Sequence, residues 1–205
     1  MIYLASRSPR RRQLLQQIGQ RCLPLLLRQV SPRRPDVDET PHPGEAAADY
    51  ALRIALAKAR FGSTILGARR LRQAPVLAAD TVVTIDGEIL GQPASRDEAA
   101  AFMRRLAGRT HEVRTVVALA FGPAETTELR TAVSVSAVRF GPLAEAQIER
   151  YCASNEPYDK AGGYAIQGLA ATFIEHLSGS YSGVMGLPLY ETAQLLRQAG
   201  VADLP

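Results

Sequence analysis

The chain has 205 residues, of which 46% are hydrophobic, so it is long enough to bury a core of its own, and we treat residues 1–205 as one domain. Its formal net charge of +4 suits anionic ligands but is too small to require nucleic acid, and we expect no stable nucleic-acid complex. No apolar run is long enough to span a membrane, and the distant Cys22 and Cys152 lack a C-x-x-C motif, so we expect a reduced, cytoplasmic protein.

The first expected elements are a strand over residues 2–4 and a helix that begins after Ser8, with Pro9 at its first position, and ends at Gly19. Three arginines, at positions 10–12, occupy the first turn of this helix. Helix N-termini favour anions and disfavour cations, because their backbone N–H groups are free. A solvated surface helix would carry the arginines without a function. A phosphate site built from backbone amides and guanidinium groups would explain why they stand at this end.

A strand is expected over residues 22–30, then a proline-rich loop over 31–43, and an amphipathic helix over 45–61. Lys58 falls on the apolar stripe of that helix, where its ammonium must either reach an anion or extend to water. Among 24 basic residues only Lys58 and Lys160 are lysines. These two positions therefore either require a compact, rotatable charge or hold lysine by chance.

The next segment predicts a buried strand over residues 75–85, a turn at Asp86-Gly87 and a short return strand over 88–90. Asp80 interrupts the apolar pattern of the first strand. A half-buried carboxylate is costly unless a metal, a cation or hydrogen bonds hold it. We therefore interpret Asp80 as a functional residue.

The rest of the chain predicts alternating helices and strands around one polar, glycine-rich segment. A serine-glutamate capping box opens the first of these helices, and a glycine stops the last. The expected elements are helices over 95–106, 144–153 and 188–199, strands over 111–121, 128–140 and 173–177, and a loop over 155–168 that carries Lys160 and Gln167. Loops of this composition are commonly binding loops.

Cations and carboxylates therefore stand on separate elements, a combination that suits metal-assisted phosphate chemistry. The chain lacks G-x-x-x-x-G-K-[ST] and G-x-G-x-x-G, which argues against a P-loop NTPase or a dinucleotide-binding fold. The three histidines are scattered and do not have zinc-site spacing. If a metal binds, oxygen ligands must hold it.

Four motifs, in order along the chain, resemble those of the Maf family. Two shorter segments, Asp38-Glu39 and Leu56-Ala57-Lys58-Ala59, add to the resemblance. The four motifs are Leu4-Ala5-Ser6-Arg7-Ser8-Pro9-Arg10-Arg11, Ala79-Asp80-Thr81-Val82-Val83, Glu156-Pro157-Tyr158-Asp159-Lys160-Ala161-Gly162 and Ile166-Gln167-Gly168. The resemblance implies an α/β fold with a two-lobed mixed sheet flanked by helices, similar to that of the inosine-triphosphate pyrophosphatases, with the active site in the cleft. It also implies a possible homodimer, which no residue supports by itself.

The same resemblance implies a nucleoside triphosphate pyrophosphatase, which releases a monophosphate and pyrophosphate. In that scheme Asp80 is the general base, and Glu39 and Asp80 bind a divalent cation, Mg²⁺ or Mn²⁺. The implied substrate-binding residues are Ser6, Arg10, Arg11, Lys58, Thr81, Lys160 and Gln167.

At two positions, Thr81 and Gln167, the residue types resemble those of the Maf subgroup that acts on dTTP and UTP. The amide of Gln167 can donate and accept hydrogen bonds, which complements the N3–H and carbonyl groups of uracil or thymine. An alternative within the family is a nucleotide-binding regulator of cell division in which turnover is secondary. Binding of RNA through the arginines is a weaker alternative, because no aromatic stacking motif accompanies them.

One position departs from the family pattern. Gln92 stands where the family usually has lysine, so a phosphate-neutralising charge is missing. Either Arg114 or another arginine, of which Arg7 is a candidate, replaces that charge, or turnover is weaker than in typical members.

Overall fold

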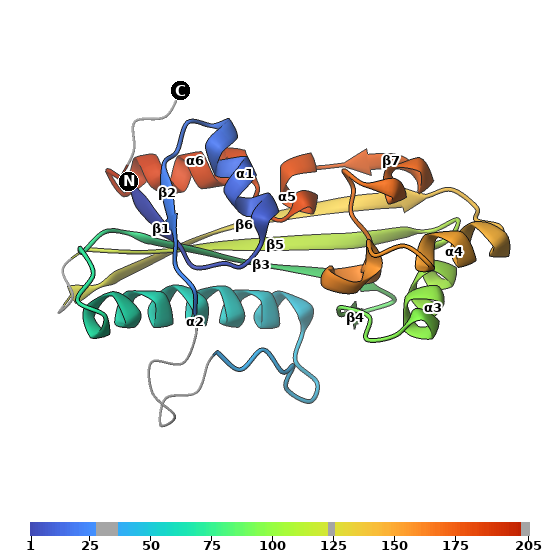
Figure 1. Cartoon of the computed structure of the whole chain (residues 1–205), viewed down its shortest axis with the longest axis horizontal. Coiled ribbons are helices and arrows are strands. Elements are labelled where there is room, and N and C mark those ends of the chain that lie inside the picture. Colours follow the sequence, from blue (N-terminus) through green and yellow to red (C-terminus); the bar gives the residue numbers. More distant parts are fainter. Residues whose placement is uncertain (28–36, 123–125, 202–205) are drawn as a thin grey trace. The chain divides into compact units, whose positions relative to one another are not determined.

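The computed structural model describes residues 1–27, 37–122 and 126–201, which form two compact units (Figure 1). The first comprises Met1–Asp80, Thr115–Val133 and Gly186–Pro205, and the second comprises Thr81–Arg114 and Ser134–Met185. Three long strands contribute residues to both units: β3 (Val76–Ile85), β5 (Thr110–Phe121) and β6 (Glu128–Phe140). Two units are consistent with the two-lobed fold that the family resemblance implies.

The described strands form one mixed seven-stranded sheet in the order β2-β1-β3-β5-β6-β7, with β4 paired to β3. Strand β1 (Ile2–Leu4) runs parallel to β2 (Cys22–Pro24) and to β3. Strand β4 (Glu88–Leu90) is antiparallel to β3, and β7 (Ile174–Ser178) is antiparallel to β6. The expectation of a mixed sheet flanked by helices is confirmed.

The described part of the first unit contains the helices α1 (Pro9–Gln17), α2 (Ala47–Ala68) and α6 (Leu189–Gln198). Figure 1 shows α2 below the strands of this unit and α1 and α6 above them. Leu14, Ile54 and Leu196 bury their side chains from the three helices. Apolar faces on both sides of the sheet therefore build the core of this unit.

Two predicted boundaries in this unit are wrong. Strand β2 ends at Pro24, so residues 25–27 are not strand, and residues 28–30 lie outside the described ranges. Helix α2 continues to Ala68, although Gly62 favours an earlier end. The glycine is there for close packing, since a Cβ on Gly62 would lie 2.7 Å from Cγ1 of Val76.

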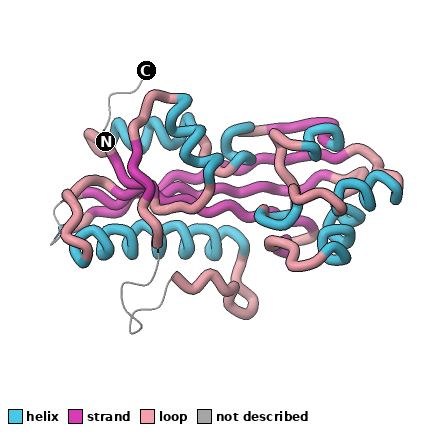
Figure 2. Tube along the Cα trace, viewed as in Figure 1, coloured by secondary structure: helices cyan, strands magenta, loops and turns pink. Residues whose placement is uncertain are grey.

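The second unit contains α3 (Arg96–Leu106), α4 (Glu145–Cys152) and the short α5 (Tyr181–Met185), which the sequence did not predict. Its glycine-rich segment forms short 3₁₀ turns, η2 (Pro157–Asp159), η3 (Ala161–Gly163) and η4 (Leu169–Phe173). Figure 2 shows how much of the connection from α4 to β7 is loop. Met103, Phe140 and Tyr164 pack in the core of this unit.

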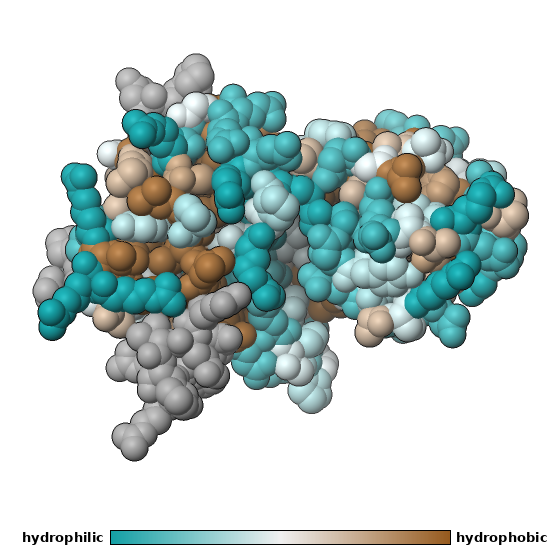
Figure 3. Space-filling view, viewed as in Figure 1, coloured by the Kyte–Doolittle hydropathy of each residue, from teal (hydrophilic) through white to brown (hydrophobic). Residues whose placement is uncertain are grey.

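The surface is mostly polar in the view of Figure 3, with hydrophobic residues gathered between β2 and α2 on the first unit. Leu23 in β2 and Leu26 just after it are 41% and 45% exposed. Among the described residues, none of the helices combines the length and the apolar character needed to cross a bilayer.

Candidate functional site

The loop between β1 and α1 brings Ser6 and Arg11 together. The hydroxyl of Ser6 accepts a hydrogen bond from the Ser8 amide and one from Nη1 of Arg11, each at 3.2 Å. The Nε of Arg11 donates to the carbonyl of Gly186 at 2.7 Å. Ser8 precedes the first residue of α1, as predicted, but its side chain makes no capping hydrogen bond, so the amides of the first turn keep their capacity to bind an anion.

The charge on Arg11 is held in a partly buried position. Burial lowers the pKa of the Arg11 guanidinium, the Asp80 carboxylate opposes that effect, and the neighbouring Arg10 adds to it. Arg10 is half-buried at the same helix end. Two arginines at a helix N-terminus repel one another and the helix dipole, so a bound anion would relieve both interactions.

The carboxylates of Asp80 and Glu39 meet at one ammonium group. Lys58 Nζ donates to Oδ1 of Asp80 at 2.9 Å and to Oε2 of Glu39 at 2.8 Å. Asp80 lies in β3 and is 8% exposed. Of the two alternatives for Lys58, the structure shows that its ammonium reaches anions rather than bulk water, and its side chain is only 12% exposed.

The environment of Asp80 prepares it to take up a proton. Burial raises the pKa of the Asp80 carboxyl, while the charges of Lys58 and Arg11 act in the opposite direction. Burial makes such a carboxylate more basic than a solvated one, while the neighbouring cations favour its ionised form. This is the balance that a general base needs.

The two carboxylates also fit a hard divalent cation. Mg²⁺ is typically bound by one or two protein carboxylates together with substrate phosphates, and Glu39 and Asp80 are such a pair. In residues 1–27, 37–122 and 126–201, no three His, Cys, Asp or Glu side chains gather closely enough to hold an ion by themselves. The donor set therefore suits a cation whose remaining ligands are water or phosphate oxygens.

The remaining predicted residues lie in the second unit. Thr81 follows Asp80 in β3 and is half-buried, and Gln167 is exposed. Lys160 turns toward its own loop, since its Nζ donates to the carbonyl of Glu156 at 2.6 Å and to the carboxylate of Asp159. The structure thus gathers Ser6 with Arg11, and Asp80 with Glu39 and Lys58, whereas Lys160 already has partners on its own loop.

Glu156 has a role that the sequence interpretation missed. Its carboxylate accepts hydrogen bonds from the amides of Leu169 and Ala170, at 2.7 and 3.0 Å, and from the hydroxyl of Tyr151 at 3.0 Å. A Cβ on Gly168 would lie 2.2 Å from Oε2 of Glu156, so a side chain there would displace the Glu156 carboxylate from these hydrogen bonds. Glu156 therefore fixes the backbone next to Gln167.

The two candidates to replace the charge missing at Gln92 differ. Gln92 itself is exposed. Arg114 forms an ion pair with Glu112 at 2.9 Å, so its charge is already partly neutralised. Arg7 is exposed in the loop that carries Ser6, in the first unit, whereas Gln92 and Arg114 belong to the second.

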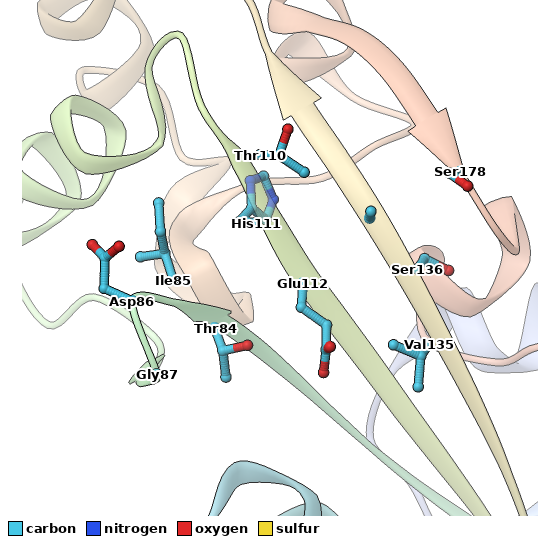
Figure 4. A pocket seen from close by; sticks show the side chains of 11 residues that line it. Thr84, Ile85, Asp86, Gly87, Thr110, His111, Glu112, Val135, Ser136 and Ser178 are labelled. Atoms are coloured by element: carbon cyan, nitrogen blue, oxygen red, sulfur yellow. The ribbon is translucent and has the colours of Figure 1, made fainter.

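A pocket of about 490 Å³ lies on the sheet of the second unit (Figure 4). It is lined by strand residues that include Thr84, Glu112, Val135 and Ser136, and by the Asp86-Gly87 turn. None of the residues predicted for the site lines it. It therefore adds nothing to the candidate catalytic group around Asp80.

Comparison with known proteins settles the relationship of the chain. The family model described as Maf-like protein matches residues 1–199. The chain belongs to the Maf family. The resemblance carried by the four sequence motifs is thereby confirmed.

Curated relatives match nearly the whole length of this Maf protein. A dTTP/UTP pyrophosphatase of Bordetella parapertussis is 53% identical over 201 residues, which cover 98% of this chain and 93% of the relative. Proteins of the same name from Aromatoleum aromaticum and Nitrosomonas europaea are 52% and 50% identical, covering 97% and 98% of this chain and 95% of each relative.

Proposed function

We propose that this chain is a nucleoside triphosphate pyrophosphatase that hydrolyses dTTP and UTP to the monophosphate and pyrophosphate. The observation that carries the proposal is the identity of about half of all residues, over nearly the full length, with relatives named for that activity. The group formed by Asp80, Glu39 and Lys58 supports it, because it provides a base and a pair of carboxylates in one place.

In the proposed reaction a water oxygen forms a bond to the α-phosphorus, and the bond from that phosphorus to the α,β-bridging oxygen breaks. The water proton passes to the carboxylate of Asp80, and the electron pair of the broken bond leaves with pyrophosphate. The charges of Lys58 and Arg11 oppose the rise in the pKa of Asp80 that burial causes, and so favour its ionised form before the reaction.

Arg10, Arg11 and the amides at the start of α1 would bind the phosphates, with Ser6 holding the guanidinium of Arg11 in place. Glu39 and Asp80 would hold a divalent cation, Mg²⁺ or Mn²⁺, which would neutralise phosphate charge when bound. Gln167 and Thr81 would recognise the pyrimidine edge, and Lys160 would neutralise phosphate after leaving the carboxylate of Asp159.

We propose that the protein resides in the cytoplasm, because its two cysteines are both free in the structure and thiols stay reduced in that compartment. A homodimer remains a prediction.

A substrate panel tests the activity. The protein is incubated with dTTP, UTP, GTP and ATP in the presence of Mg²⁺ or Mn²⁺, and the products are separated by ion-exchange chromatography. We expect monophosphate and pyrophosphate from dTTP and UTP. Release of orthophosphate, or equal turnover of the purine nucleotides, would contradict the proposal.

The role of Asp80 is tested with Asp80→Asn, which nearly keeps the shape but removes the base. We expect kcat to fall by about 10²–10⁴-fold with an unchanged circular dichroism spectrum. The matched control is Asp86→Asn, because Asp86 lies on the exposed turn after the same strand and pairs with Arg109. A regulator that does not need turnover would keep its cellular effect in Asp80→Asn, whereas an enzyme would lose it.

A further inference from the structure

The segment that carries Glu39 is tied to α2 by three successive backbone carbonyls. The carbonyl of Asp38 accepts a hydrogen bond from Nη1 of Arg53 at 3.4 Å, and that of Thr40 accepts one from Nη2 at 3.0 Å. Between them, the carbonyl of Glu39 accepts a hydrogen bond from the hydroxyl of Tyr50 at 2.9 Å. Figure 2 shows the loop before α2 folding back along the start of that helix. The backbone is thus held on both sides of Glu39 and at Glu39 itself.

Arg53 is itself held in one orientation. Its Nε and Nη2 donate to the two carboxylate oxygens of Glu45, at 2.6 and 2.7 Å, and its guanidinium lies 5.4 Å from the ring centre of Tyr50. These hydrogen bonds lower the pKa of Glu45 to about 2. A bidentate pair of this kind fixes the planar guanidinium, so Arg53 offers its remaining donors to the loop at little further entropic cost.

The same helix also holds the side chain of Glu39. Lys58 lies two turns beyond Tyr50, and its ammonium contacts the Glu39 carboxylate at 2.8 Å. The apolar stripe of the helix anchors it, since Ala51, Ile54 and Ala55 are fully buried. One rigid helix therefore determines where both the backbone and the carboxylate of Glu39 lie.

Without the backbone contacts, only the carboxylate of Glu39 would be held. That side chain is 52% exposed, and a single ion pair at such a site adds little order. A cation that needs both carboxylates would then have to order the loop as it binds, and its affinity would fall by that cost.

We propose that Tyr50 and Arg53 are positioning residues that hold Glu39 in place to share a divalent cation with Asp80. This inference rests on the proposed function, in which Glu39 and Asp80 hold the cation. Neither Tyr50 nor Arg53 contacts the reacting atoms in this scheme. Their effect should appear in the affinity for the metal, and much less in the KM for the nucleotide.

The test compares Tyr50→Phe, which removes one hydroxyl, and Arg53→Met, which removes the guanidinium, with Arg60→Met as the control. Arg60 is an exposed arginine on the same helix and contacts none of these residues through a described side-chain interaction. Free Mn²⁺ is titrated into each protein without nucleotide and followed by electron paramagnetic resonance. Amide hydrogen exchange of residues 37–46 is measured on the same samples.

We expect Tyr50→Phe to raise the Kd for Mn²⁺ by about three- to tenfold, the effect of losing one hydrogen bond, and Arg53→Met to raise it further. Amide exchange should speed up in residues 37–46 and stay unchanged in the strands. Arg53→Lys keeps the charge but not the planar guanidinium, so its Kd for Mn²⁺ should lie between those of Arg53→Met and the wild type. Arg60→Met should match the wild type.

Unchanged Mn²⁺ affinity in both Tyr50→Phe and Arg53→Met would overturn the inference, and so would a wild-type protein that binds no Mn²⁺ at millimolar concentration. Neither result would touch the proposed activity, which is judged separately by the products that the wild type forms from dTTP and UTP.

Discussion

His111 makes the stability of the second unit sensitive to acid. Its ring is 3% exposed, and its Nε2 lies 2.7 Å from the hydroxyl of Tyr164. Its Nδ1 is buried and has no hydrogen-bond partner among the described residues. The rings of Phe140 and Tyr164 pack edge-on against it, with centroids 5.3 and 5.4 Å away. Burial among these groups lowers the pKa of His111 from 6.5 to about 4.

The lowered pKa fixes both the sign and the size of the effect. Between the pKa of the unfolded chain and that of the folded protein, the unfolded chain binds more protons, so the free energy of unfolding falls as the pH falls. From pH ~7 to pH ~5, a single histidine with these two pKa values lowers the free energy of unfolding by about 2 kcal/mol. Most of the loss falls below pH ~6.5 and ends near the folded pKa.

Replacing His111 with phenylalanine keeps a ring in the core and removes the titrating group. The variant leaves the Tyr164 hydroxyl unpaired, so we expect it to be less stable than the wild type at neutral pH by about 1–3 kcal/mol. Between pH ~7 and pH ~5, however, its free energy of unfolding should change by about 2 kcal/mol less than that of the wild type.

The measurement is urea denaturation of both proteins at the two pH values, followed by circular dichroism. His176→Gln is the control, because His176 is an exposed histidine in β7 of the same unit and should leave the pH dependence unaltered. If His111→Phe loses as much stability on acidification as the wild type does, burial of a neutral His111 is not the cause, and the reasoning is refuted.

Two further predictions test packing and loop geometry. Gly62→Ala should destabilise the protein by about 1–3 kcal/mol, because the new methyl group meets the stiff side chain of Val76 at 2.7 Å. Gly67→Ala in the same helix meets nothing within 4 Å, so it should stabilise the protein by about 0.5–1 kcal/mol. Thermal unfolding of both variants decides this, and equal signs would contradict it. Glu156→Gln replaces one carboxylate oxygen, which accepts a hydrogen bond from the amide of Leu169 or Ala170, with an NH₂ group that cannot accept one. We therefore expect faster amide exchange at Leu169 and Ala170 and, with the fold intact, a smaller preference for dTTP over GTP. An unchanged preference would separate the loop from substrate recognition.

Elements that local chemistry determines could be predicted from the sequence. The Asp86-Gly87 turn adopts positive φ at both residues, 56° and 79°, as this pair predicts. Ser95 accepts a hydrogen bond from the Glu98 amide at 3.1 Å, while the Glu98 side chain bonds to the amide of Ala94 rather than to that of Ser95. Neighbours in sequence decide these features, so their pattern is visible without tertiary structure.

Features that tertiary contacts determine could not be predicted in this way. The end of α2 was missed because the reason for Gly62 is its approach to a strand that follows later in the chain. The hydrogen bonds that Tyr50, Arg53 and Glu156 make to the loop backbone were missed because the partners in these bonds are backbone groups, which every residue possesses. A hydrogen bond to a carbonyl or an amide leaves no residue type in the sequence to reveal it.

The two lysines of this arginine-rich chain are an intermediate case, in which the residue type is visible in the sequence but its contacts are not. Lys58 contacts two carboxylates from different segments, and Lys160 contacts a carbonyl and a carboxylate of its own loop. In both cases one ammonium donates to two acceptors, and its N–H donors can rotate in a way that those of a planar guanidinium cannot. Arg11 differs from them, because two nitrogens of its planar guanidinium donate to the Ser6 hydroxyl and to the Gly186 carbonyl. That a position with such contacts requires lysine stays a prediction, and Lys58→Arg should not preserve the contacts of Glu39 and Asp80.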